Sequence, residues 1–260
     1  MLKGLKNFVK TIIPQANGLQ RIYLGLYYFG LWGMNFGRTA DLKGSGELKA
    51  LKLLRFHLGD SPTILDVGAN IGDYSIALVE TFPRANIHSF EPVRATFEML
   101  CYNTESFQNI TTHHLGLGDL DEDSKIFFSE TSAHSSMLGH RGVQSQDQFT
   151  ETIQVVRLDN FALTAQIEIV DFLKIDVEGF EINVLRGAEE LLKAKKIKCI
   201  QFEFGGTMID AHVFLKDFYD LLDENYNLFR ITKSGLFPIG GYHSHYEIFH
   251  YCNYMAILKD

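Results

Sequence analysis

Carboxylates that end short apolar runs are the residues of this chain whose types and spacing point to chemistry. Residues 63–72 read TILDVGANIG, an apolar run that carries Asp66 into a turn with glycines spaced G-x-x-x-G. A helical pattern follows, so backbone N–H groups at a helix start would face a ligand bound at the turn. The turn lacks the G-x-G-x-x-G spacing of dinucleotide sites, and the Asp66 carboxylate would repel a pyrophosphate. It would attract an ammonium and a sulfonium, which favours S-adenosylmethionine; the alternative is a connecting turn that binds nothing.

Two further carboxylates end the next predicted strands. Glu91 follows the apolar run Asn86–Phe90, about 20 positions after Gly68, where nucleoside-binding α/β folds place an acidic residue on the ribose hydroxyls. Asp119 follows Gly118 and would lie on the same edge of the sheet, where a carboxylate can accept from the exocyclic amine of adenine. The alternatives are a solvated charge for Glu91 and an Asx turn for Asp119.

A denser group of carboxylates follows a later apolar run. The segment LKIDVEGFE carries Asp176, Glu178 and Glu181, and a second apolar run, CIQFEF, carries Glu203 on the same strand face as Gln201. Crowded carboxylates repel one another unless a proton or a cation relieves them. Glu181 also suits the first turn of the next helix. We therefore predict that Asp176, Glu178 and Glu203 are catalytic.

Histidines offer another source of a base or of metal ligands. His134 lies in a polar insertion, and His243, His245 and His250 lie in the segment GGYHSHYEIFH. The H-x-H spacing with Glu247 could bind a metal ion. The carboxylates of Asp176, Glu178 and Glu203 could also bind one. An exposed strand or loop shows the same alternation, and we predict no resident metal.

Short apolar runs alternate with helical patterns along the chain. Between residues 46 and 118, strands are predicted at Thr63–Val67, Asn86–Phe90 and 110–117, with helices at 46–58, 74–80 and 95–103. This β-α-β-α-β order is typical of a parallel sheet with crossover helices. Later strands are predicted at 125–128, 153–158, Val170–Ile175, Ile197–Phe204, 228–231 and 254–258, with helices at 181–193 and 212–222. Residues 121–148 are polar and are interpreted as an irregular insertion or lid.

Composition narrows the class of protein. The 260 residues suit one large domain with an extra N-terminal piece, and 46% hydrophobic residues are enough for a full core. A formal net charge of −8 argues against a nucleic acid as the main partner. The three cysteines, Cys101, Cys199 and Cys252, form no C-x-x-C pair, so we expect reduced thiols and a cytoplasmic protein.

The segment at residues 22–36, IYLGLYYFGLWGMNF, is an aromatic helical stripe. It is shorter than the ~20 residues that span a bilayer. We expect a cap that packs over the main domain or at a homodimer contact, with a lipid interface beside the basic Lys3, Lys6 and Lys10 as the alternative. The predicted division is a helical, aromatic cap at residues 1–45 and an S-adenosylmethionine-binding domain at 46–260.

The motifs ILDVGANIGDYS, SFEP, GLGD and LKIDVEGFEINVLRGAEELL, followed by a strand that ends in EFG, together resemble the FkbM family of methyltransferases. The resemblance covers roughly residues 46–204. It implies an α/β fold with a doubly wound, mostly parallel, seven-stranded Rossmann-like sheet and a bound S-adenosylmethionine. Carried over position by position, it implies these contacts: Asp66, Gly68 and Asn70 for the methionine part, Glu91 for the ribose, Asp119 for the adenine, and Asp176 and Glu178 at the reacting centre.

The expected activity is O-methylation of a hydroxyl on a sugar, lipid or secondary-metabolite acceptor, as the resemblance implies. An alcohol is a poor nucleophile until it loses its proton, so a general base should lie within hydrogen-bond reach. Two alternatives stay open: an NAD(P)-dependent oxidoreductase, and a nucleoside-binding partner protein without catalysis. The expected partner is a small-molecule or glycan acceptor, with no nucleic acid.

Overall fold

A mostly parallel sheet runs through the protein and positions the predicted site. The computed structural model describes residues 17–37, 42–129, 135–136 and 148–259. The strands of the main sheet are β1 Thr63–Val67, β2 Asn86–Phe90, β3 Ile110–His113, β8 Val170–Ile175, β9 Ile197–Phe204, β10 Tyr226–Thr232, β11 Gly235–Pro238 and β12 Cys252–Leu258. Their order is β11-β10-β12-β9-β8-β1-β2-β3. Neighbours from β3 to β9 pair in parallel, whereas β12 runs antiparallel between β9 and β10.

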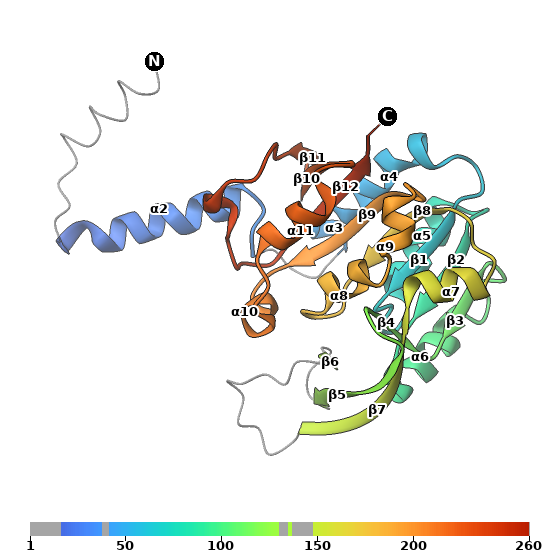
Figure 1. Ribbon diagram of the computed structural model, residues 1–260. Coiled ribbons are helices and arrows are strands. Elements are labelled where there is room, and N and C mark those ends of the chain that lie inside the picture. Colours follow the sequence, from blue (N-terminus) through green and yellow to red (C-terminus); the bar gives the residue numbers. More distant parts are fainter. Residues whose placement is uncertain (1–16, 38–41, 130–134, 137–147, 260) are drawn as a thin grey trace.

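Helices cover both faces of this sheet (Figure 1). The helices are α2 Gln20–Gly33, α3 Leu42–Ser45, α4 Glu47–Leu58, α5 Asp73–Thr81, α6 Arg94–Thr104, α7 Leu158–Thr164, α8 Glu181–Arg186, α9 Glu189–Lys193, α10 Thr207–Ala211 and α11 Leu215–Leu222, with 3-10 turns η1 Asn17–Leu19 and η2 Ser244–Tyr246. Alternate strand residues face opposite ways. Ile64 and Phe172 therefore join the apolar cluster that contains Leu51 of α4, whereas Leu65 joins the cluster that contains Leu185 of α8. The sheet is doubly wound, as predicted.

The main sheet has eight strands in the described part of the chain, where seven were expected. The additional strand is β11, which pairs with β10 in an antiparallel hairpin. The hairpin turns at Lys233 and Ser234 and enters β11 at Gly235, whose φ of +121° lies in the region that favours glycine. A short polar turn between two apolar stretches hid this edge strand from the sequence pattern.

A second, smaller sheet stands beside the main one. Its strands are β4 Gly116–Gly118, β5 Glu122–Ser129, β6 Ser135–Ser136 and β7 Gln148–Arg157, in the order β4-β7-β5-β6. The predicted strand 110–117 was wrong as one element, because it divides into β3 in the main sheet and β4 in the second. The predicted strand 125–128 lies within β5 and most of the predicted strand 153–158 lies within β7; both strands are longer than predicted and pair over eight residues, so the insertion predicted at 121–148 begins with a regular strand.

The helix predicted at 181–193 is divided into α8 and α9 at Gly187. A Cβ atom at Gly187 would lie 1.8 Å from the carbonyl oxygen of Gly118, so only glycine permits this approach to β4. The carboxylate of Asp159 then accepts hydrogen bonds from the N–H groups of Glu190 and Leu191 at 3.0 and 3.1 Å. These contacts start α9 as a separate helix.

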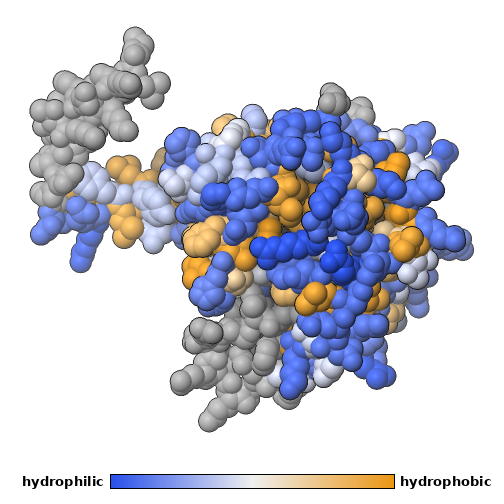
Figure 2. All heavy atoms as spheres, in the orientation of Figure 1, coloured by the Kyte–Doolittle hydropathy of each residue, from blue (hydrophilic) through white to orange (hydrophobic). Residues whose placement is uncertain are grey.

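Helix α2 projects from the body of the protein and joins it at the helix's C-terminal end (Figure 1). Leu31 is its buried residue. Its exposed large hydrophobic side chains are Ile22, Leu24, Leu26, Tyr27, Tyr28, Phe29 and Trp32. Figure 2 shows hydrophobic surface on part of this projection. The helix therefore does not cover the main sheet, and its role in a homodimer or at a lipid interface stays a prediction. None of the described helices combines the length and apolar character needed to cross a membrane.

Candidate active site

The glycine turn after β1 is fixed by close backbone contacts. The N–H groups of Gly68 and Ala69 both donate to the carbonyl oxygen of Phe90, at 3.0 and 2.9 Å. Gly68 has a φ of +81°, and a Cβ atom there would lie 1.8 Å from the carbonyl oxygen of Asp176. The turn thus brings together the carboxyl ends of β1, β2 and β8, where ligands bind in doubly wound sheets.

Gly68→Ala is expected to destabilise the protein by about 3 kcal/mol, because it adds a positive φ penalty to a clash with backbone. Chemical denaturation measures this change. Gly206→Ala is the matched control, since Gly206 has a φ of −63° and the nearest atom to its added Cβ is 4.0 Å away. Equal stability of the two variants would contradict the close packing of the turn.

Glu91 anchors the turn from the end of β2. Its Oε2 accepts a hydrogen bond from the N–H of Asn70 at 3.1 Å, and its Oε1 accepts one from the N–H of Val93 at 2.9 Å. Asn70 has a left-handed φ of 49°. Burial raises the pKa of Glu91 to about 7, although both hydrogen bonds act to lower it. A desolvated carboxylate of this kind is stabilised when further hydroxyl donors reach it.

A small apolar cavity of about 60 Å³ opens beside Glu91. Its wall includes Gly68 of the turn, Leu117 of β4 and Phe180 before α8. The lining combines Glu91 and Asp176 with apolar side chains, the kinds of group that suit the donating ribose hydroxyls and the flat, apolar faces of the adenine in an adenosyl group. Asp119 is not among the described residues that line this cavity, and its backbone oxygen accepts from Arg157 at 3.2 Å. Its predicted contact with adenine stays a prediction.

Asp66 lies beneath the turn, with none of its surface exposed. Its Oδ2 accepts from the hydroxyl of Ser75 at 2.6 Å, and Ser75 is hydrogen-bonded in turn to Ser89. Its Oδ1 has no hydrogen-bond partner and lies 3.9 Å from Nζ of Lys174. Burial raises the pKa of Asp66, against the lowering effect of Lys174 and Ser75. Its predicted contact with the methionine ammonium stays untested.

The three predicted catalytic carboxylates are brought together at the ends of β8 and β9. Burial raises the pKa of Glu203 well above its usual range, and the charges of Asp176, Glu178 and Glu181 raise it further. Glu203 also shares a hydrogen bond with Asp176. Two carboxyl groups can form that bond only when one holds a proton. Glu203 is 7% exposed, whereas the Asp176 side chain is 34% exposed.

The loop between β8 and α8 is held in a tight turn. Glu178 has a left-handed φ of 53° and Gly179 one of 105°. The buried carboxyl of Glu181 accepts hydrogen bonds from the N–H groups of Val177 and Gly179, and burial raises its pKa to about 8. Glu181 is thus a positioning residue for the loop that carries Asp176 and Glu178.

Lys174 is the residue of this site that the sequence prediction missed. Its Nζ lies 3.0 Å from Oδ2 of Asp176 and 4.6 Å from the centre of the Tyr74 ring. Burial would lower the pKa of Lys174, but the charges of Asp176, Asp66 and Glu47 outweigh it and raise the pKa. The available signal was register: Lys174 on β8 pairs with Asp66 on β1 and with Gln201 on β9.

A buried polar network continues from Lys174 toward the N-terminal part of the chain. Gln201 accepts from the Tyr74 hydroxyl at 2.8 Å and donates to Oε1 of Glu47 at 2.7 Å. Glu47 also accepts from the Ser45 hydroxyl at 2.7 Å, and burial raises its pKa. A single ammonium thus faces the carboxyl groups of Asp66, Asp176 and Glu47.

The histidines considered as metal ligands do not form a metal site in the described part of the chain. The rings of His243 and His245 lie 4.6 Å apart, but Glu247 accepts from the N–H groups of Leu215 and Lys216 and so caps the start of α11. His134 lies outside the described residues. Across the described ranges, no group of three or more His, Cys, Asp or Glu side chains is placed to hold a metal ion.

Sequence comparison agrees with this geometry. A family model described as the methyltransferase FkbM domain matches residues 66–230. Methyltransferase 1 of Beauveria bassiana is 30% identical over 149 residues, which are 50% of this chain and 60% of that protein. Hexuronic acid methyltransferase AglP of Haloferax volcanii is 28% identical over 196 residues, 75% of each chain. The 2-O-methyltransferase NoeI of Sinorhizobium fredii is 23% identical over 176 residues, 62% of this chain and 71% of that protein.

The match thus spans less than two thirds of the first of these relatives. Among solved structures, fibrillarin from Aeropyrum pernix with natively bound S-adenosyl-L-methionine aligns at a TM-score of 0.45 and 14% identity, over 80% of this chain and 74% of that one. The family model covers well over half of the chain, and its range contains the glycine turn, Glu91 and the carboxylates of β8 and β9. The chain therefore belongs to the FkbM family of S-adenosylmethionine-dependent methyltransferases.

Proposed function

We propose that the protein transfers the methyl group of S-adenosylmethionine to a hydroxyl oxygen of a small-molecule or glycan acceptor. Two relatives support oxygen as the accepting atom and a sugar as the acceptor class, since their names are 2-O-methyltransferase and hexuronic acid methyltransferase. Membership of the family decides against the oxidoreductase alternative.

The bound cofactor supplies a methyl carbon already activated by its sulfonium. We assign the ribose hydroxyls to Glu91, which lines the small apolar cavity. The methionine part is assigned to the turn at Gly68 and Asn70, with Asp66 beneath it, and the adenine to the region of Asp119. What the protein contributes is mainly alignment of acceptor and donor, an effect that reaches roughly 7–11 kcal/mol in favourable systems.

Asp176 is our proposed general base. As the acceptor oxygen bonds to the methyl carbon and the methyl–sulfur bond breaks, the hydroxyl proton passes to a carboxylate oxygen of Asp176. Asp176 is the more exposed member of its hydrogen-bonded pair with Glu203, so an acceptor can reach it. Glu203 holds Asp176 in place through that bond, and Glu178 borders the acceptor. The observation that carries the proposal is this carboxyl pair at the carboxyl ends of β8 and β9.

Product analysis tests oxygen methylation directly. The protein is incubated with methyl-labelled S-adenosylmethionine and a panel of 4-nitrophenyl glycosides, and products are followed by mass spectrometry before and after mild alkali. We expect an alkali-stable methyl ether. Label that mild alkali releases would indicate a methyl ester, and binding of the cofactor without any transfer would favour the non-catalytic alternative.

Cofactor affinity should depend on pH through Glu91. Its pKa of about 7 leaves the carboxyl mostly protonated at pH 6 and mostly ionised at pH 8. Only the ionised form accepts from both ribose hydroxyls, so S-adenosylhomocysteine should bind roughly tenfold more weakly at pH 6 than at pH 8. Isothermal titration at both values measures this ratio.

Glu91→Gln is the control for that titration, because it keeps the shape of the side chain and removes its charge. The variant should bind weakly with a flat pH profile. A raised carboxyl pKa makes folding less favourable as the pH rises through 7, so tighter binding at pH 8 cannot reflect a more stable fold. An unchanged pH profile in Glu91→Gln would contradict the assignment of Glu91 to the ribose.

A further inference from the structure

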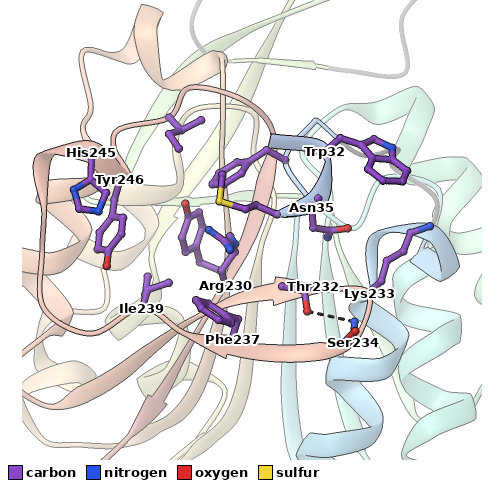
Figure 3. A pocket seen from close by; sticks show the side chains of 15 residues that line it. Trp32, Asn35, Arg230, Thr232, Lys233, Ser234, Phe237, Ile239, His245 and Tyr246 are labelled. Atoms are coloured by element: carbon purple, nitrogen blue, oxygen red, sulfur yellow. Dashed lines mark hydrogen bonds between the residues drawn. The ribbon is translucent and has the colours of Figure 1, made fainter. Parts of the chain in front are cut away.

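A second cavity, of about 650 Å³, is lined by residues of β10, β11 and β12, the strands at one end of the main sheet. It is bounded by the end of α2, the β10–β11 hairpin and the segment around η2 (Figure 3). None of its described lining residues lines the cavity beside Glu91. Its volume lies within the range of sites that bind drug-sized molecules. The proposed cofactor contacts leave this cavity without an assignment.

Arg230 lies at the centre of the cavity's lining (Figure 3). It is 9% exposed, and its Nε is buried without a hydrogen-bond partner. The guanidinium carbon lies 4.9 Å from the centre of the Phe36 ring and 5.3 Å from that of Phe237. Ring faces hold the cation in position, but they do not satisfy its N–H donors.

Two other polar side chains of this wall already have hydrogen-bond partners. Nδ2 of Asn35 donates to the carbonyl oxygens of Ser45 and Ile231, and the Thr232 hydroxyl donates to the carbonyl oxygen of Gly235. Among the described residues that line this cavity, the buried side-chain donor without a partner is Nε of Arg230. An unpaired buried polar group on a charged side chain is costly unless a ligand supplies the partner.

Charge in the cavity has one sign. Arg230 and Lys233 line it, and no carboxylate occurs among its described lining residues, although the whole chain has a formal net charge of −8. Such a site attracts an anion and repels a cation. The planar guanidinium of an arginine matches a carboxylate with two parallel hydrogen bonds.

Aromatic side chains make up much of the remaining wall, including Tyr254 and, as Figure 3 shows, Trp32 and Tyr246. Flat apolar surfaces of this kind accept the face of a sugar or aromatic ring. We infer that this cavity binds a ligand that carries a carboxylate on a sugar or aromatic ring, with the carboxylate on Arg230. The inference concerns binding alone and does not depend on methyl transfer.

A matched pair of ligands tests this inference on the full chain without cofactor. The probes are 4-nitrophenyl β-D-glucuronide and 4-nitrophenyl β-D-glucoside, which differ at the carboxylate. By isothermal titration we expect the wild-type protein to bind the glucuronide at least about tenfold more tightly than the glucoside, since a charge-assisted pair is lost with the neutral ligand. This comparison needs no variant, so it is independent of any folding defect.

Variants then locate the contact. Arg230→Gln should remove the preference for the glucuronide, with a melting curve to confirm folding, whereas Arg94→Gln should keep it, because Arg94 is exposed and pairs with Glu98 on α6. Lys233→Gln, at the exposed rim, should weaken glucuronide binding only slightly. Equal binding of the two ligands, no binding of either, or a preference that survives in folded Arg230→Gln would overturn the inference.

Discussion

Asp176→Asn is expected to lower the rate of methyl transfer by about 10²–10⁴-fold, the range typical of a lost general base. The amide keeps the shape of the side chain but cannot take the acceptor's proton. Affinity for S-adenosylhomocysteine should change less than the rate, because Glu91 and the glycine turn hold the cofactor and the amide keeps the shape of the side chain at the wall of the cavity. Single-turnover transfer and isothermal titration separate the two effects.

Asp210→Asn is the matched control for Asp176→Asn, since Asp210 is an exposed carboxylate on α10. It should retain wild-type activity. Glu203→Gln tests the pairing itself: it removes the carboxyl that shares a hydrogen bond with Asp176, so it should lower the rate less than Asp176→Asn does. Wild-type activity of Asp176→Asn would contradict the assignment of the base.

Lys174→Met is expected to destabilise the protein by roughly 3–5 kcal/mol, because it leaves buried carboxyl groups without their cation. Lys174 is 4% exposed and lies between Asp176 and Asp66, with Glu47 close enough to shift its pKa. Chemical denaturation of the purified variant measures the loss.

A double variant shows whether charge causes that loss. Lys174→Met combined with Asp66→Asn should be more stable than Lys174→Met alone, since the unpaired negative charge is removed. Lys193→Met removes an exposed lysine that pairs with Glu189 and should leave stability unchanged. A Lys174→Met protein as stable as the wild type would contradict the charge network.

The central strands could be predicted because each is a short apolar run that is followed directly by a glycine or an acidic residue. β1, β2, β8 and β9 begin and end at the predicted residues, closed by Gly68, Glu91, Asp176 and Gly205. The ends of strands and helices were not predicted where a contact with a distant part of the chain decides where the element stops. Nothing local separates β3 from β4, and the end of α8 depends on the approach of Gly187 to β4.

The closeness of Asp176, Glu178 and Glu203 could also be predicted, because carboxyl ends of parallel strands meet at one edge of a sheet. The buried network around Lys174 was not, since a lysine within a strand usually extends to solvent and register alone reveals its neighbours. The cavity at Arg230 was hidden for another reason. Its wall comes from three segments far apart in the sequence, near residues 32–36, 230–239 and 245–254.

Titration with adenosyl ligands shows whether the edge formed by the glycine turn and Glu91 binds S-adenosylmethionine. S-adenosylmethionine, S-adenosylhomocysteine and NAD are each titrated into the wild-type protein and into Glu91→Ala. We predict micromolar binding of both adenosyl ligands, a large loss of it in the variant, and no binding of NAD. Folded wild-type protein that binds neither adenosyl ligand, or a Glu91→Ala variant that binds them as tightly as the wild type, would contradict the account.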